Sequence, residues 1–120
     1  MEDYYLDLVS AKVAPAERPW EDGITLEDGK SRPFIVERGW SGPGGTYVEQ
    51  WAILRDGRYV VYQSKPRYIS VRGPQAVSRE VDRVDKPIAM EPGTYDLVFV
   101  AEGFRMGSVK IEARPNEAVA

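Results

Sequence analysis

The 120-residue sequence predicts an all-β protein, organised as a single antiparallel β-sandwich of about seven or eight short strands. Three observations favour this fold class. No stretch shows the i, i+3, i+4, i+7 spacing of apolar residues that marks an amphipathic helix. Eleven glycines and nine prolines interrupt the chain throughout. The short runs between them are rich in β-branched and aromatic residues, and turns at about ten-residue spacing are typical of sandwiches.

The first quarter of the chain is expected to contain two strands. Alternating apolar residues predict a strand over Tyr4–Val13. The following segment, Ala14–Lys30, holds five carboxylates and is expected to be irregular apart from a short strand at Ile24–Leu26. Asp28-Gly29 is a typical turn pair.

A further strand is predicted at Phe34–Arg38, followed by a loop over Gly39–Thr46. The loop is expected because these eight residues include four glycines and a proline. A phosphate-binding loop is disfavoured, since no lysine follows the glycines and a strand rather than a helix comes next.

The strongest local signal is a hairpin formed by Tyr47–Arg55 and Arg58–Ser64. The intervening Asp56-Gly57 accepts the positive φ values of a type I′ turn. A two-residue loop predicts the register, which places Leu54 opposite Tyr59, Ile53 opposite Val60, Ala52 opposite Val61 and Trp51 opposite Tyr62.

The last part of the sequence predicts a short strand at Tyr68–Arg72, an edge strand within Ala76–Val84 and a second hairpin. The second hairpin joins Thr94–Ala101 to Phe104–Ala113 through Glu102-Gly103. Its apolar side chains change parity beyond Gly107, which predicts a β-bulge there. The ordered core of one domain spanning 1–120 is expected over about 4–113, with 114–120 frayed.

One segment resembles known domains. Pro92-Gly93-Thr94-Tyr95-Asp96-Leu97-Val98-Phe99 is similar to the entry into the last hairpin of immunoglobulin-like and fibronectin-like sandwiches, and the Trp51 strand with Asp56-Gly57 resembles their central hairpin. The resemblance covers about 60 residues and implies an architecture, which does not define a function.

Composition excludes several kinds of chemistry. The chain has no histidine and no cysteine, so disulfides, a thiol nucleophile and cysteine-ligated metals are ruled out. We therefore expect no enzyme, no cofactor and no metal site, although carboxylates within residues 17–28 leave Ca²⁺ binding open. No apolar run is long enough for a membrane-spanning helix. The acidic start Met1-Glu2-Asp3 predicts a cytoplasmic location, with a virion protein or a trimmed secreted form as alternatives.

Two sets of residues are candidates for recognition. Trp20 and Trp40 fall in predicted loops and are expected to be exposed, so with Tyr68 they are candidate ligand contacts. Both predicted hairpins are apolar on both parities, which indicates a covered outer sheet face. The candidate partner contacts there are Tyr47, Tyr59 and Tyr62, with Arg55 and Arg58 as rim charges.

These observations favour a non-catalytic protein-interaction module, acting as an accessory, adaptor or structural-assembly protein. Its partner is expected to be another protein or a second copy of the chain. Covering of the face by Tyr4–Val13 is the structural alternative. A carbohydrate- or small-ligand-binding module is the alternative function, followed by a hydrolase without histidine or cysteine. Residues 31–86 hold ten bases and six acids, but the overall net charge of −3 argues against nucleic acid as the partner.

Overall fold

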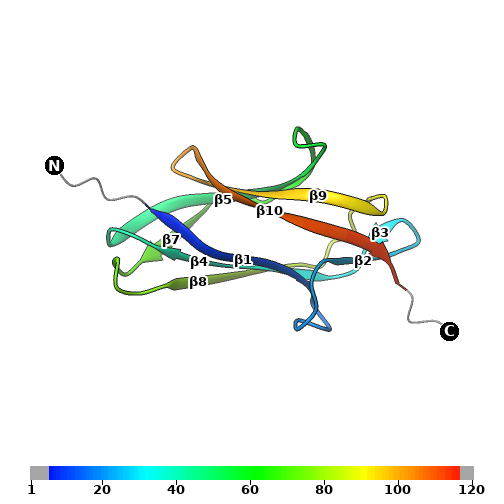
Figure 1. The fold of residues 1–120 in the computed structure, drawn as a ribbon, viewed down its shortest axis with the longest axis horizontal. Helices are drawn as coiled ribbons and strands as arrows, with labels where there is room; N and C mark the ends of the chain where they lie inside the picture. Colours follow the sequence, from blue (N-terminus) through cyan, green and yellow to red (C-terminus); the bar gives the residue numbers. More distant parts are fainter. Residues whose placement is uncertain (1–5, 117–120) are drawn as a thin grey trace.

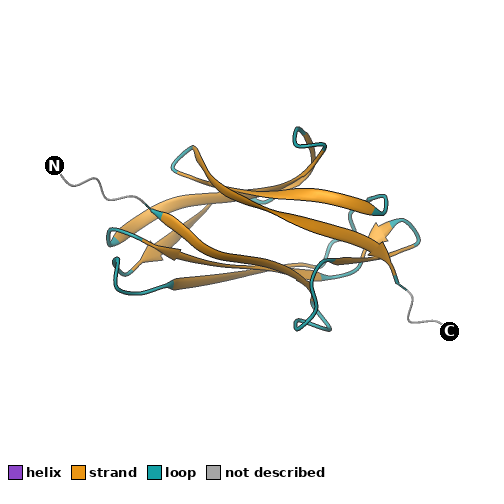
Figure 2. Ribbon diagram, in the orientation of Figure 1, coloured by secondary structure: helices purple, strands orange, loops and turns teal. Residues whose placement is uncertain are grey.

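The computed structural model describes residues 6–116, which form ten strands and no helix, so the all-β prediction is confirmed (Figures 1 and 2). No segment in this range is a helix able to cross a membrane. The strands are β1 (Asp7–Pro15), β2 (Ile24–Glu27), β3 (Lys30–Ser31), β4 (Phe34–Ser41), β5 (Gly45–Arg55), β6 (Tyr59–Gln63), β7 (Arg67–Val71), β8 (Ser78–Val84), β9 (Gly93–Ala101) and β10 (Phe104–Pro115).

The strands are arranged in two facing sheets. A three-stranded sheet has the order β1-β4-β8, and β8 is an edge strand as predicted. A seven-stranded sheet has the order β3-β2-β10-β9-β5-β6, and β7 pairs with the same strand, β5, that β6 does. Figure 1 shows β5, β9 and β10 in the upper layer and β4 and β8 in the lower layer.

The purely antiparallel sandwich is not confirmed, because the seven-stranded sheet is mixed. After β1 the chain leaves the three-stranded sheet, and β2 joins the other sheet parallel to the end of β10, with Ile24 opposite Ala113. This pairing extends β10 to Pro115, so the prediction that residues 114 and 115 are frayed is wrong. The amide of Asn116 also donates to Leu26 O at 2.8 Å. Residues 1–5, which include the predicted start of the first strand, and residues 117–120 lie outside the described range.

The hydrophobic core lies between the two sheets. The rings of Trp40 on β4 and Phe99 on β9 meet edge to face across it, with centroids 6.4 Å apart. Alternate residues of each central strand point into this core, because successive side chains of a strand face opposite sides of its sheet. The largest fully buried apolar residues are Trp40, Trp51, Phe34, Phe99, Ile24, Ile53, Leu97 and Val36.

The central hairpin has the predicted turn but not the predicted register. Asp56 and Gly57 have φ values of 55° and 71°, and the Arg58 amide donates to Arg55 O at 3.2 Å. This is a type I′ turn. The turn, however, includes Arg58, and a bulge interrupts the ladder between Ile53 and Leu54. The observed pairs are therefore Arg55 with Tyr59, Leu54 with Val60, Ile53 with Tyr62 and Ala52 with Gln63.

The second hairpin agrees with the prediction. Glu102 and Gly103 both have positive φ, and β9 and β10 pair from Ala101 and Phe104 onward. The register shifts between Arg105 and Gly107, which confirms the bulge predicted from the change in apolar parity.

The predicted loop over Gly39–Thr46 is largely strand. β4 continues to Ser41 and β5 begins at Gly45, so only residues 42–44 connect the two strands. Gly39 lies inside β4 opposite Ser10 of β1. The outward side of Gly39 is covered by neighbouring side chains, so a larger residue does not fit there. A Cβ atom at this position would lie 2.7 Å from Val77 Cγ1 and 2.8 Å from Ser10 Oγ.

Candidate functional site

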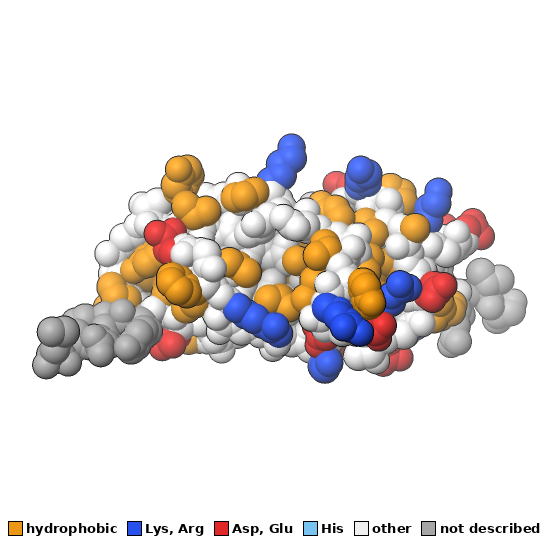
Figure 3. All heavy atoms as spheres, turned by 90° about the horizontal axis from the view of Figure 1, so that it is seen from above, with side chains coloured by type: hydrophobic (Ala, Val, Ile, Leu, Met, Phe, Trp, Pro, Cys, Tyr) orange, Lys and Arg blue, Asp and Glu red, His pale blue; other side chains and the backbone are white. Residues whose placement is uncertain are grey.

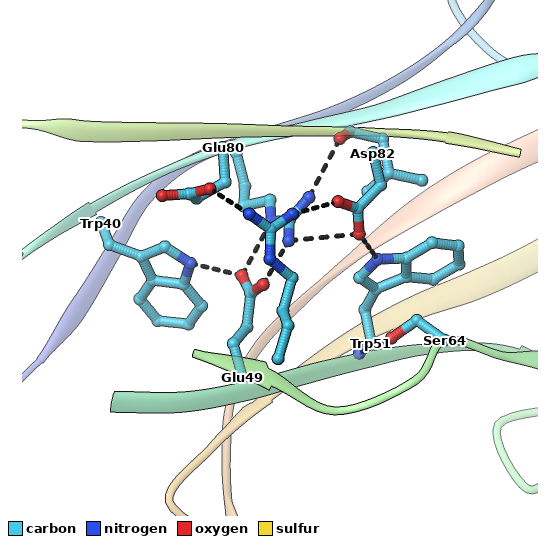
Figure 4. A network of polar contacts seen from close by, with 9 residues as sticks. Trp40, Glu49, Trp51, Ser64, Glu80 and Asp82 are labelled. Carbon is cyan, nitrogen blue, oxygen red and sulfur yellow. Dashed lines mark hydrogen bonds and ion pairs between the residues drawn. The ribbon is translucent and has the colours of Figure 1, made fainter. Parts of the chain in front are cut away.

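The most unusual feature of the interior is an ion pair between the two sheets (Figure 4). Arg38 of β4 and Glu49 of β5 are both completely buried. The Arg38 Nε donates to Glu49 Oε2 at 2.7 Å, and its Nη2 donates to Glu49 Oε1. The indole nitrogen of Trp40 donates to Glu49 Oε2 at 2.6 Å. Strand alternation places these groups here, because Arg38 and Trp40 share the core-facing parity of β4 with Phe34 and Val36.

The ion pair continues into a second group of charges toward the surface. Asp82 of β8 lies 3.3 Å from Arg38 Nη2 and accepts a 2.7 Å hydrogen bond from the Trp51 indole nitrogen. Arg67 of β7 forms an ion pair with Asp82 and another, at 2.7 Å, with Glu80. Figure 4 shows this group between the two sheets, and its side chains come from β5, β7 and β8.

The protonation states follow from these contacts. Burial alone would raise the pKa of Asp82, but the Trp51 hydrogen bond and the charges of Arg38 and Arg67 outweigh burial, and the pKa is lowered. Burial alone would lower the pKa of Arg38, but hydrogen bonding and charge from Glu49 and Asp82 raise it above its ordinary value. Both shifts favour the charged forms of Arg38 and Asp82.

These side chains link the two sheets, and we call Arg38, Glu49, Trp40 and Asp82 the clamp. Both carboxylate oxygens of Glu49 are already occupied by Arg38 or Trp40. The attraction within a buried ion pair is largely offset by the cost of desolvating both charges, whereas removal of one partner leaves an unpaired buried charge and is strongly destabilising. Within residues 6–116 no group of three or more acidic side chains is placed to hold a metal ion, and this includes the acidic residues of segment 17–28.

The clamp reaches solvent at a shallow depression. Its lining includes Trp51, Ser64, Arg67 and Asp82, and its volume is about 350 Å³. Ser64 shapes the wall, because its hydroxyl accepts a 2.9 Å hydrogen bond from the Trp51 amide. Among its charged lining groups, Arg67 and Asp82 are paired with each other, and Arg83 is paired with Asp85.

The predicted ligand contacts are not brought together. Trp20 is 71% exposed and Tyr68 is 76% exposed, as expected for surface aromatics. No ring contact joins these two residues in the described part of the chain. The prediction that Trp40 is an exposed loop residue is wrong: it lies in β4 with 0% exposure, so its ring offers no surface to a ligand.

The predicted partner contacts divide into two groups. Tyr47 and Tyr62 are half-buried and pack against the core, with Tyr62 5.6 Å from the Trp51 ring. Tyr59 is 52% exposed, and the guanidinium groups of Arg58 and Arg55 lie 5.3 and 6.0 Å from its ring centroid. Tyr59 therefore packs against both Arg55 and Arg58.

An apolar surface that the sequence only partly indicated lies on the outer face of the seven-stranded sheet. We call it the outer stripe, and it consists of Val48, Leu54, Val60, Tyr68 and Val100 around Val98, which shares their face but is only 6% exposed. Its members share one face through the pairs Val48–Tyr68, Leu54–Val60, Gln50–Val100 and Ala52–Val98. Figure 3, seen from above this sheet, shows hydrophobic side chains spread between basic ones.

Sequence reasoning missed Arg38, Glu49 and Asp82. A signal for them was present, because Arg38 and Glu49 each interrupt an apolar parity: Phe34-Val36-Arg38-Trp40 and Glu49-Trp51-Ile53. A charge on the core-facing parity of a strand requires a buried partner.

Comparison with known proteins shows likeness at the level of fold. No protein-family model and no curated protein matches this chain. The alkylpurine DNA glycosylase AlkC of Pseudomonas fluorescens, bound to DNA containing an abasic site analog, is similar over 91% of this chain and 30% of its own, with 15% identity and a TM-score of 0.53. The beta-glucosidase of Listeria innocua in complex with isofagomine is similar over 93% of this chain and 16% of its own, with 11% identity and a TM-score of 0.55. The chain thus spans less than a third of either protein.

Proposed function

We infer that this chain is a single-domain, non-catalytic protein-interaction module with the general architecture of an immunoglobulin-like or fibronectin-like sandwich. The observation that carries this inference is the outer stripe. A soluble domain normally places polar residues on the outer face of a sheet. Here that face includes Val60 and Tyr68, which are 55% and 76% exposed, with Val48 at 37%. Exposed apolar faces of this kind are typical of interaction surfaces.

The surroundings of the outer stripe also fit a protein interface. Tyr59, Arg55 and Arg58 form a compact aromatic and cationic group at the turn end of the same hairpin, where Tyr59 pairs with Arg55 on the parity opposite to the Leu54–Val60 pair of the outer stripe. Tyrosine and arginine are enriched where protein partners dock, and charged residues at the rim steer association. The partner is proposed to be another protein or a second copy of this chain. A cytoplasmic location stays a prediction.

The test places charge on the outer stripe. Val48→Lys combined with Val100→Lys should abolish the capture of specific partners from an extract of the native cell. Val9→Lys combined with Val81→Lys, at exposed positions of β1 and β8 in the other sheet, is the control of equal charge change and should retain them. Light scattering of the wild type, the double variant and the control detects a second copy as the partner. Capture and oligomeric state that are the same in all three proteins would contradict the proposal.

A second candidate is the binding of a carbohydrate or another small ligand. The exposure of Trp20 and Tyr68 favours it, because aromatic rings stack on sugars and planar ligands. A glycan array and a thermal-shift screen test this candidate, since a ligand present at 100 times its Kd stabilises the native state by about 2.7 kcal/mol. The stabilisation should disappear in Trp20→Ala or Tyr68→Ala.

A further inference from the structure

The outer edge of β6 is open. β6 lies at the end of the seven-stranded sheet and pairs with β5 through one edge, while no strand among residues 6–116 pairs with its other edge. An open edge presents unpaired backbone amides and carbonyls to solvent.

The composition of β6 is unusual for an open edge. Proteins commonly protect such edges with charged residues or proline inside the strand. The open edge strand β8 follows this rule, with charged residues at four of its seven positions. β6 reads Tyr-Val-Val-Tyr-Gln and has neither a charge nor a proline. Its first two residues, Tyr59 and Val60, are 52% and 55% exposed.

Positive charges flank this strand on both sides. Residues 55–67 contain four bases and a single acid, Asp56. Arg67 is engaged by Glu80 and Asp82, whereas Arg55, Arg58 and Lys65 form no ion pair within the described range. The open edge therefore lies between uncompensated cations, Arg55 and Arg58 before it and Lys65 after it.

These charges argue against a second copy of the chain as the occupant. Two β6 strands paired antiparallel about Val61 would place Tyr59 of one copy opposite Gln63 of the other. Arg58 of each copy would then approach Lys65 of the other, and like charges at neighbouring cross-strand positions are destabilising. A strand with acidic residues at both ends is the complementary occupant.

We propose that the open edge of β6 accepts an extended acidic segment of a partner protein as an additional strand. This proposal rests on the proposed function as an interaction module. Backbone hydrogen bonds supply binding in this mode, and alternate side chains supply selectivity. Tyr59 and Val60 contact apolar residues of the added strand, while Arg55, Arg58 and Lys65 contact its carboxylates.

The experiment measures binding of a fluorescent ten-residue peptide of alternating glutamate and valine by anisotropy. The wild type should bind it saturably, and the affinity should fall with added salt. The variant Arg58→Glu/Lys65→Glu should lose at least about tenfold in affinity, as for removal of charge-assisted contacts worth about 1.4 kcal/mol in total. Arg79→Glu/Arg105→Glu is the control of equal charge change, at exposed residues of β8 and β10, and should bind as the wild type does.

Two further peptides separate backbone from charge effects. The same peptide methylated on every backbone nitrogen should not bind, because it cannot donate strand hydrogen bonds. A peptide with lysine in place of glutamate should not bind either. The proposal is wrong if no saturable binding occurs at millimolar peptide, if the methylated peptide binds equally, or if the two charge variants behave alike. A β6-dependent dimer that excludes the peptide would also overturn it. If binding at β6 fails while the outer-stripe variant still abolishes partner capture, the proposed function stands and only this inference falls.

Discussion

Arg38 and Glu49 form a completely buried ion pair that joins two different sheets, with Arg38 Nε 2.7 Å from Glu49 Oε2. They lie eleven positions apart in sequence, and the turn between β4 and β5 takes the chain from one sheet to the other. Trp40 and Asp82 complete the hydrogen bonding of the pair. The stability of the protein should therefore depend on both members of the pair and on Asp82.

Removal of one member of the pair should be strongly destabilising. Glu49→Leu leaves the Arg38 charge buried without its main partner, and loss of one partner of a buried pair costs about 3–5 kcal/mol. The double variant Arg38→Met/Glu49→Leu should recover most of this loss, because no charge is then left unpaired. Urea denaturation measures the free energy of unfolding. Glu37→Gln, which affects only the exposed pair with Arg79, is the control and should change stability by about 1 kcal/mol or less. If the double variant loses as much stability as Arg38→Met and Glu49→Leu lose separately when added together, the two side chains do not stabilise each other as proposed.

Stability should fall in acid through Asp82. Its pKa is lowered in the folded protein, so its contribution is complete above the ordinary value of 3.8. It is lost as the pH falls through the lower folded pKa, because the unfolded state binds the proton more readily. Thermal unfolding between pH 6 and pH 2 should show a shallower acid slope in Asp82→Asn than in the wild type. Ser64→Ala removes no titrating group and should lower stability equally at all pH values. Identical slopes in wild type and Asp82→Asn would refute the assignment.

The type I′ turn of the central hairpin should be sensitive at Gly57. Its φ of 71° is accessible to glycine but costly for a β-branched residue, and a Cβ there meets only Asp96 Oδ2, at 3.8 Å. Gly57→Val should therefore destabilise by about 1–2 kcal/mol through conformation alone. Asp56→Asn keeps a side chain that tolerates positive φ and should be nearly neutral. An unchanged denaturation midpoint for Gly57→Val would show that the turn has another conformation in solution.

Gly39 should be sensitive for a different reason, which is space. Its backbone is compatible with any residue, but a Cβ atom would lie 2.7 Å from Val77 Cγ1. Gly39→Ala should destabilise by about 1–2 kcal/mol through overpacking. Adding Val77→Ala should restore part of that loss, since it removes the nearest atom. If the second substitution makes the protein less stable still, the close approach is not the cause.

Local sequence signals were sufficient for much of the fold. Asp56-Gly57 and Glu102-Gly103 predicted their turns because the backbone angles of a tight turn depend on the residues inside it. The change of apolar parity at Gly107 predicted a bulge for the same reason, since alternation is a property of a single strand. The exposure of Trp20 also followed from its local setting.

Tertiary structure decided what depends on neighbours distant in the sequence. The register of the central hairpin was mispredicted in two steps. The turn includes Arg58, so Arg55 pairs with Tyr59, and a bulge between Ile53 and Leu54 shifts the ladder again because it depends on how β6 lies against β5. Trp40 was mispredicted because local glycines indicated a loop, whereas pairing with β1 and β8 on both sides continues β4 to Ser41. Parity indicates which side of a sheet a residue faces, but it does not identify the residue opposite. The partnership of Arg38 with Glu49 and Asp82, and the parallel pairing of β2 with β10, therefore required the two sheets to be assembled, because non-local pairing sets these contacts.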